Sequence, residues 1–186
     1  HAAIPDPLWS RGLGDVYKRQ LKDWVRKVWN FDKPYQHPGR DLGTGTQFGL
    51  SLGVAYAYKD TERLVVDLQP DGDLMFDLGG LWIAAKYEIP ILVIMYNNRA
   101  YYNDWAHQIS VANKRGTDPD RAYIGMDLEG PAPDFAHIAK GLDWYAEGPI
   151  TDPKDIQSAV KRAMKEVKKG KPALVDIITW RRGEAA

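Results

Sequence analysis

The feature that most constrains the fold is a pair of short apolar runs that flank a helical pattern. Residues 63–68 (RLVVDL) and 91–96 (ILVIMY) are rich in β-branched residues, as buried strands are. Between them, residues 77–87 (DLGGLWIAAKY) predict a helix that ends at Glu88–Ile89–Pro90. A strand, a helix and a second strand in this order predict a βαβ unit whose parallel strands are buried on both faces.

The rest of the chain continues this alternation. Further elements are predicted at residues 47–60 (helix), 134–140 (helix), 143–150 (strand), 152–170 (helix) and 173–179 (strand). Asp152 followed by Pro153 is typical of a helix start, and Gly170 is typical of a helix end. The alternation indicates a three-layer, doubly wound α/β fold, with a mostly parallel sheet and helices on both faces.

The N-terminal part of the chain and residues 99–133 are less regular. Residues 1–20 show no clean period and are interpreted as an unassigned N-terminal arm, which leaves residues 21–186 as one domain. Residues 21–29 predict a first helix, with its apolar residues on one face. Residues 99–133 are polar, aromatic and Pro-rich, which predicts a long irregular segment on the surface. This segment is expected to form an interface in an assembly.

Composition narrows the classes of partner. The 25 basic and 25 acidic residues cancel, so no nucleic acid or anionic membrane is expected as a partner. The sequence has no cysteine, which excludes disulfides and thiolate zinc sites and is compatible with a cytoplasmic location. The longest apolar run, residues 89–96, is far shorter than the roughly 20 residues that a membrane helix needs.

Polar residues follow both strands of the βαβ unit. Asp71, Gly72 and Asp73 form a turn after the first strand, and Asn97–Asn98 follow the second. Ligands of parallel sheets bind beyond the carboxyl ends of the strands, so these two loops are expected to lie side by side. A carboxylate and an amide oxygen suit Mg²⁺, which can in turn hold a diphosphate. The first turn of helix 77–87 could offer N–H groups to the same anion.

An acid–glycine turn, a helix and an apolar strand that ends in Asn–Asn resemble the signature of thiamine diphosphate enzymes. The resemblance is strongest to the branch that contains acetolactate synthase, pyruvate decarboxylase and benzoylformate decarboxylase. It implies that Mg²⁺ is bound by Asp71, the side chain of Asn98 and the backbone carbonyl of Ala100. It also implies that Gly72 and Asp73 contact the diphosphate.

Residues 42–58 (LGTGTQFGLSLGVAYAY) resemble the Gly-rich turn and helix that precede this strand in the family. The resemblance, which covers roughly residues 40–180, implies that the turn at Gly45 contacts the aminopyrimidine ring. By the same comparison Thr46, or else Gln47, props the cofactor in its bent form. Tyr101 follows the Asn pair and is expected to reach the cofactor as well.

The resemblance implies decarboxylation of a 2-oxo acid, followed by protonation or by carboligation to a second carbonyl compound. The family carries its activating glutamate on a separate pyrimidine-binding domain, and no glutamate of this chain lies in a matching motif. We therefore expect no catalytic residue in this chain, a pyrimidine-binding domain in the same or another chain, and a homo-oligomer. Pro70 replaces the first glycine of the family signature, which is tolerable if its φ is near the value of about −65° that proline imposes.

Three other interpretations fit parts of the pattern. The first is an NAD(P)-binding Rossmann domain, whose glycine pattern before a helix is resembled by Gly43, Gly45 and Gly49, and whose downstream acid would be Asp67. No apolar strand precedes these glycines, which is an argument against that interpretation. A nucleotide-sugar transferase also has an Asp-x-Asp after an apolar strand, but it leaves Asn97–Asn98 unexplained. A non-catalytic relic of the diphosphate-binding domain, used for binding or assembly, also fits.

Overall fold

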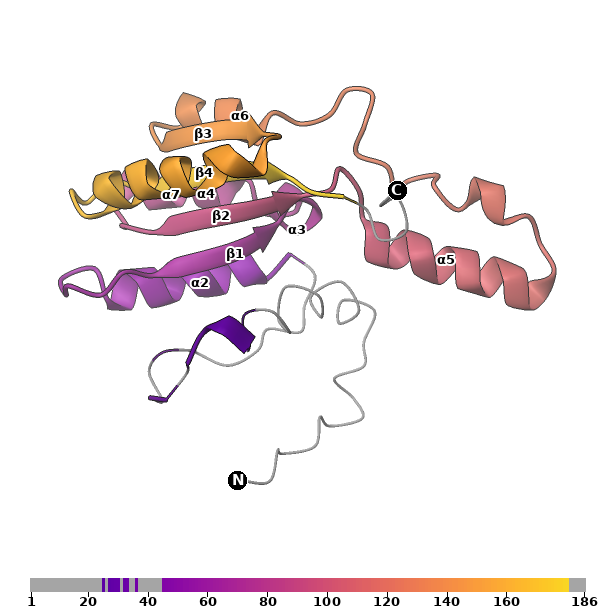
Figure 1. Ribbon diagram of the computed structural model, residues 1–186, viewed down its shortest axis with the longest axis horizontal. Helices are drawn as coiled ribbons and strands as arrows, with labels where there is room; N and C mark the ends of the chain where they lie inside the picture. The colour runs from indigo at the N-terminus through magenta and orange to yellow at the C-terminus, as the bar shows by residue number, and fades with distance from the viewer. Residues whose placement is uncertain (1–24, 26, 31, 34–35, 37–44, 181–186) are drawn as a thin grey trace. The chain divides into compact units, whose positions relative to one another are not determined.

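Four parallel strands form one sheet in the described part of the chain, in the order β1-β2-β4-β3 (Figure 1). They are β1 (Val66–Pro70), β2 (Leu92–Asn97), β3 (Tyr145–Ile150) and β4 (Ala173–Ile178). β1 pairs with β2 from Val66 opposite Leu92 to Pro70 opposite Tyr96. The predicted parallel βαβ unit is therefore confirmed, and its two strands are direct neighbours.

The computed structural model describes residues 25, 27–30, 32–33, 36 and 45–180. The chain divides into two units. The sheet unit consists of Gly45–Ala100 and Leu128–Ala186, and the α5 unit of His1–Thr44 and Tyr101–Asp127. The predicted arm at residues 1–20 and the glycine at position 43 lie outside the described residues. Within the predicted helix 21–29, the described positions 25, 27 and 28 are helical.

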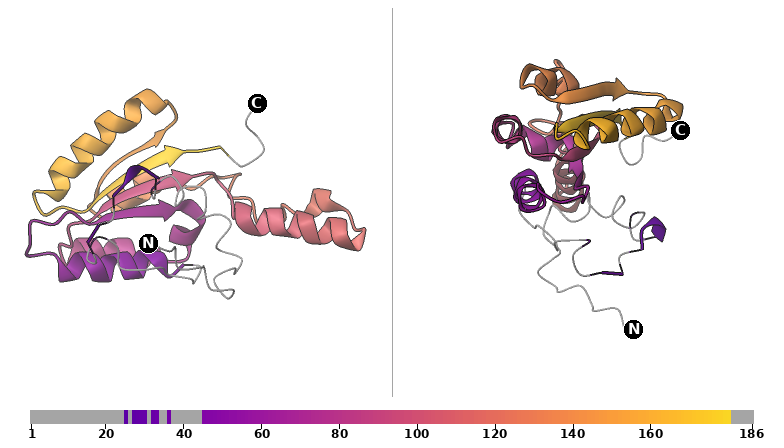
Figure 2. Two further views of the ribbon diagram at one scale, coloured as in Figure 1. Left: turned by 60° about the horizontal axis from the view of Figure 1, so that its bottom comes forward. Right: turned by 90° about the vertical axis from the view of Figure 1, so that its left-hand side faces the viewer.

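Helices cover both faces of the sheet (Figure 2). On one face lie α2 (Gln47–Ala57), α4 (Gly79–Lys86) and α6 (Phe135–Gly141), and on the other lies α7 (Pro153–Val167). The side chains of β2 alternate between the two: Val93 and Met95 belong to the first core, and Leu92 and Ile94 pack with the second. This alternation confirms the predicted α/β fold with helices on both faces.

Glycine allows α2 and α4 to pack closely. A β-carbon at Gly80 of α4 would lie 2.7 Å from a ring carbon of Phe48 on α2. The Phe48 ring is fully buried and lies 6.2 Å from the ring of Trp144. Trp144 Nε1 donates to the carbonyl of Leu81 at 2.7 Å, so the same aromatic cluster also fixes α4.

Helix α7 begins and ends as the sequence predicts. The side chain of Asp152 accepts a hydrogen bond from the backbone N–H of Lys154 at 2.9 Å, and Pro153 is the first helical residue. Gly170 adopts a φ of 93° shortly after the helix ends.

Three predictions around the acidic segment are wrong in detail. The first strand covers Val66–Pro70 instead of residues 63–68, and the predicted turn begins a short helix, α3 (Asp71–Met75). Pro70 is tolerated in the strand because β1 is at the edge of the sheet. Its φ of −72° agrees with the expected value and leads directly into α3. Asp77 does not open the next helix, since α4 begins at Gly79 with Leu78 as its N-cap.

The α5 unit contains a helix that the sequence interpretation missed. Residues 99–133 were expected to be irregular, but α5 (Tyr102–Arg115) and the 3₁₀ helix η2 (Pro119–Arg121) lie within them. The ring of Trp105 lies 6.1 Å from that of Tyr102 and 6.3 Å from that of Tyr123, so these aromatic residues pack on one another. An acid in its first turn and two basic residues in its last turn complement the helix dipole of α5.

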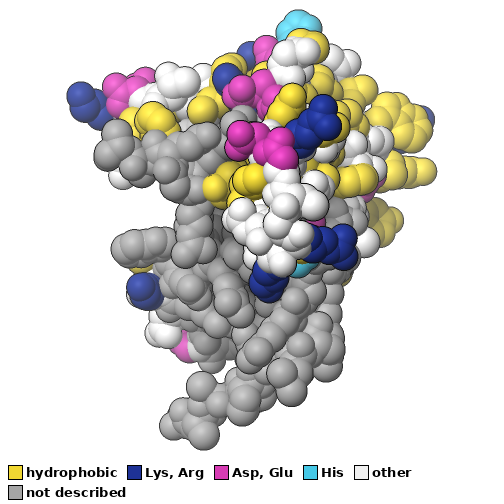
Figure 3. Space-filling model, turned by 90° about the vertical axis from the view of Figure 1, so that its right-hand side faces the viewer, with side chains coloured by type: hydrophobic (Ala, Val, Ile, Leu, Met, Phe, Trp, Pro, Cys, Tyr) yellow, Lys and Arg dark blue, Asp and Glu magenta, His cyan; other side chains and the backbone are white. Residues whose placement is uncertain are grey.

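None of the described helices is both long and apolar enough to cross a bilayer. On the face drawn in Figure 3, the coloured acidic and basic side chains lie next to one another, with apolar side chains between them. This mixture agrees with the net charge of zero and does not favour a polyanionic partner.

Candidate functional site

The residues of the predicted cation site lie at the carboxyl ends of β1 and β2. Asp71 follows β1 and is fully buried, while Asn97 is the last residue of β2 and is also buried. Asn98 is half-buried and Ala100 is buried. Since the two strands are neighbours, the structure brings Asp71 together with the turn Asn97–Ala100, as the sequence predicts.

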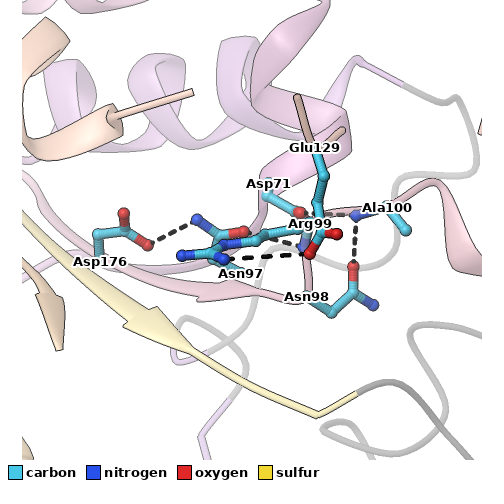
Figure 4. A network of polar contacts seen from close by, with 7 residues as sticks. All are labelled: Asp71, Asn97, Asn98, Arg99, Ala100, Glu129 and Asp176. Carbon is cyan, nitrogen blue, oxygen red and sulfur yellow. Dashed lines mark hydrogen bonds and ion pairs between the residues drawn. The ribbon is translucent and has the colours of Figure 1, made fainter. Parts of the chain in front are cut away.

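Two side-chain oxygens from the two segments converge on one backbone N–H. The N–H of Ala100 donates to Asp71 Oδ2 at 3.2 Å and to Asn98 Oδ1 at 3.1 Å (Figure 4). A carboxylate oxygen and an amide oxygen are thus directed at the same point. Carboxylate and amide oxygens are the kind of ligand that Mg²⁺ prefers.

The turn that carries Asn98 is held by the neighbouring Asn97. Asn97 Oδ1 accepts from the N–H of Arg99 at 3.0 Å, and its carbonyl accepts from the N–H of Thr179 at 2.7 Å. Arg99 has a φ of 56°, which is uncommon for a residue other than glycine. Its guanidinium lies 4.0 Å from Glu129, and both side chains are exposed, so this ion pair adds little stability.

An acid that the sequence interpretation did not select lies beside this turn. Asp176 of β4 is buried, and its Oδ1 accepts from Asn97 Nδ2 at 3.1 Å (Figure 4). Burial raises the pKa of Asp176 to about 6, helped by the carboxylates of Asp71 and Asp134, while the Asn97 hydrogen bond and Arg99 oppose the rise. The signal in the sequence was an acid inside the otherwise apolar strand 173–178.

The electrostatics around the end of β2 are negative. Burial raises the pKa of Tyr96 well above its usual value, and the carboxylates of Asp73, Asp67 and Asp71 add to the rise. A diphosphate would be repelled by these acids unless a cation lay between them.

Gln47 faces into the protein. Its Nε2 donates to Asp67 Oδ1 at 2.8 Å and to the carbonyl of Leu68 at 2.7 Å. The Gln69 amide is oriented so that both its nitrogen and its oxygen have hydrogen-bond partners. The nitrogen donates to Asp67 Oδ2 at 2.9 Å, and the oxygen accepts from the N–H of Leu74 at 3.2 Å. This buried network joins α2, β1 and α3. Its hydrogen bonds engage Asp67, the acid that would bind a ribose in a dinucleotide-binding domain.

The other predicted site residues lie just before α2, in α3 and in the α5 unit. Gly45 has a φ of 77°, and a β-carbon there would lie 2.6 Å from Phe76 Cβ, so this position requires glycine. Thr46 is exposed just before α2, and Gly72 and Asp73 lie in α3. Tyr101 lies in the α5 unit, where its N–H donates to the carbonyl of Met126 at 2.8 Å.

The described residues include no group of three or more His, Cys, Asp or Glu side chains that could hold a metal. A cation at Asp71 would therefore rely on amide, carbonyl, water and ligand oxygens, which is typical of Mg²⁺. A parallel α/β sheet with such donors at its carboxyl edge defines a domain that can bind an anionic ligand there.

Residues 20–177 match the family described as thiamine pyrophosphate enzyme, C-terminal TPP binding domain. The chain belongs to this family, and thiamine diphosphate, another name for the pyrophosphate, is the family's cofactor. The resemblance predicted from the sequence is thereby confirmed. The match leaves the dinucleotide and nucleotide-sugar interpretations without support.

Individual relatives agree with this assignment. The acetolactate synthase isozyme 3 large subunit of Escherichia coli is 25% identical over an alignment of 185 residues that covers 94% of this chain and 30% of that protein. The sulfopyruvate decarboxylase subunit beta of Methanothermobacter thermautotrophicus is 28% identical over 141 residues, covering 68% of this chain and 72% of that subunit. The solved thiamine diphosphate-dependent 4-hydroxybenzoylformate decarboxylase of Rhodococcus jostii is 27% identical, with a TM-score of 0.59 over 77% of this chain and 24% of that one. The chain spans between 25% and 30% of the length of the acetolactate synthase relatives that it matches.

Proposed function

We propose that Asp71, the side chain of Asn98 and the backbone carbonyl of Ala100 bind Mg²⁺, which in turn holds the diphosphate of thiamine diphosphate. The observation that carries this proposal is the convergence of the Asp71 and Asn98 oxygens on a single N–H. The donor set fits the cation, because Mg²⁺ commonly combines one or two protein carboxylates with phosphate and water oxygens.

Further contacts to the cofactor are proposed from the family resemblance, at Gly45, Thr46, Gln47, Gly72, Asp73 and Tyr101. Gly72 is buried and adds no side chain next to the diphosphate. Thr46 is exposed, whereas the amide of Gln47 is bonded within the protein, so Thr46 is the better candidate to support the bent cofactor.

We propose that the complete enzyme decarboxylates 2-oxo acids or joins them to a second carbonyl compound, in the cytoplasm. The names of the relatives support this class of substrate. When bound, the cofactor supplies a nucleophilic carbon and an electron sink, while this chain binds and orients the diphosphate. The activating glutamate is expected from a pyrimidine-binding domain of the same or another chain, within a homo-oligomer. The sulfopyruvate decarboxylase subunit beta, of which the match covers 72%, is named as a separate subunit, which supports such a division.

Calorimetric titration tests the proposal. Thiamine diphosphate and, separately, inorganic pyrophosphate are titrated into the chain with Mg²⁺ and with EDTA. Binding is expected only with Mg²⁺, and Asp71→Asn is expected to weaken it at least about tenfold, since a charged ligand of the cation is lost. Asp60→Asn, which alters an exposed acid before β1, is the matched control and should bind normally. Binding that is indifferent to both Mg²⁺ and Asp71→Asn would rule the proposal out.

A further inference from the structure

A carboxylate is buried in β4, where the strand is otherwise apolar. Only 1% of Asp176 is exposed. Gly148 packs so closely over it that a β-carbon at position 148 would lie 2.7 Å from Asp176 Cβ. Burying a carboxylate is unfavourable unless hydrogen bonds compensate for its lost hydration. The role of Asp176 therefore depends on which group donates a hydrogen bond to it.

That partner is the side-chain amide of Asn97. Asn97 Nδ2 donates to Asp176 Oδ1 at 3.1 Å (Figure 4). The second oxygen, Asp176 Oδ2, has no hydrogen-bond partner within the part of the chain that the structure describes. An ionised carboxylate only accepts hydrogen bonds, so it faces the NH₂ end of the amide. The contact thereby fixes which way the Asn97 amide points.

The orientation of this amide matters for the turn that follows. With its NH₂ group on Asp176, Asn97 directs Oδ1 to the N–H of Arg99 at 3.0 Å. Arg99 has a φ of 56°, a conformation that a non-glycine residue keeps only with local support. The next N–H, that of Ala100, is the one on which Asp71 and Asn98 converge.

We propose that Asp176 is a positioning residue for the cofactor's cation. Its carboxylate orients the Asn97 amide, and that amide holds the turn that presents Asn98 and Ala100. Asp176 acts through Asn97 and needs no contact with the cofactor. What the turn binds rests on the proposed function, whereas the link from Asp176 through Asn97 to Arg99 does not.

Exchanging the two side chains tests this link. At pH 7.5, Asn97→Asp places two carboxylates against each other, while the double variant Asn97→Asp with Asp176→Asn lets an amide at position 176 donate to a carboxylate at position 97. Hydrogen exchange of the Arg99 and Ala100 amides, followed by NMR in the ligand-free chain, is expected to accelerate about tenfold or more in Asn97→Asp. The double variant should return to within roughly threefold of wild type. Asn113→Asp, at an exposed position of α5, is the matched control and should leave both amides unchanged.

The same variants can be compared by the Mg²⁺ dependence of thiamine diphosphate binding. Asn97→Asp should raise the Mg²⁺ concentration for half-maximal thiamine diphosphate binding about tenfold, and the double variant should restore it. A merely structural role would lower the melting temperature without moving this Mg²⁺ midpoint. If wild type binds no thiamine diphosphate, the proposed function fails, and the exchange experiment still decides the link to Arg99. Should Asn97→Asp fail to fold, recovery of folding and of amide protection in the double variant supports the link. Unchanged exchange of Arg99 in Asn97→Asp, or a double variant that is not restored, overturns it.

Discussion

Asp71 Oδ2 accepts a hydrogen bond of 3.2 Å from the backbone N–H of Ala100, although 29 positions separate the two residues in the chain. This bond ties the end of β1 to the turn after β2. Asp71 is fully buried, so its carboxylate is separated from bulk water. A divalent cation next to it would replace part of the lost hydration.

Mg²⁺ alone is therefore expected to stabilise the fold. A ligand that binds only the folded state adds about 2.7 kcal/mol at a hundredfold excess over its Kd. Thermal unfolding followed by circular dichroism should show a melting temperature that rises with Mg²⁺ in wild type and stays constant in Asp71→Asn. An equal rise in both proteins would place the stabilising cation elsewhere.

Gly80→Ala is expected to destabilise the protein by about 1–3 kcal/mol, because the added methyl group meets the Phe48 ring in a packed core. Urea unfolding measures the change. Gly79→Ala is the matched control, since nothing lies within 4 Å of a β-carbon there. That control should be neutral or slightly stabilising, as alanine favours helices. Equal effects of the two substitutions would contradict the close packing of α2 on α4.

Gln69→Leu should cost about 2–4 kcal/mol of unfolding free energy, because it leaves the Asp67 carboxylate and the Leu74 N–H with one hydrogen bond fewer inside the protein. Gln157→Leu makes the same change at an exposed position of α7 and should stay within about 0.5 kcal/mol of wild type. Chemical denaturation of both variants provides the comparison. A small effect at position 69 would mean that water replaces the amide.

Asp176 gives the stability a defined pH dependence. Its pKa is about 6 in the folded protein, against about 4 in an unfolded chain, so the folded state holds this proton more tightly. The stabilisation is fully present below about pH 4 and is lost as the pH rises through 6, by at most about 3 kcal/mol. Asp176→Asn removes this loss.

The unfolding free energy of Asp176→Asn minus that of wild type should therefore rise between about pH 4 and pH 6 and then level off. Urea unfolding at a series of pH values measures this difference. Other carboxylates affect both proteins alike and cancel. A difference that is constant with pH would show that the pKa of Asp176 is not raised.

The sequence was sufficient where a regular pattern carried the information. The βαβ unit was predicted because its strands are short apolar runs rich in β-branched residues. Helix α7 was predicted because its apolar residues share one helical face and because Asp152, Pro153 and Gly170 mark its ends. The pairing of β1 with β2 then brought Asp71 to the Asn97–Ala100 turn. That these residues bind Mg²⁺ and the cofactor stays a prediction.

Other features depend on tertiary contacts. Helix α5 was missed because Trp105 and Ile109 lie one turn apart among many polar residues, in a segment whose prolines suggested a loop. The shift of β1 to include Pro70 follows from its place at the sheet edge, which one sequence does not reveal. Asp176 was overlooked because its partner, Asn97, is 79 residues away.

The position of β4 has a consequence for how a newly made chain folds. In the described part of the chain β4 is the last strand in sequence, yet it lies between β2 and β3 in the sheet. On the ribosome β1 and β2 can pair early, whereas β3 finds its neighbour only after residues 173–178 have been synthesised. Asp176 arrives with this last strand, so Asn97 obtains its partner only when the sheet is complete. The turn after β2 would thus gain this support only once β4 has joined the sheet.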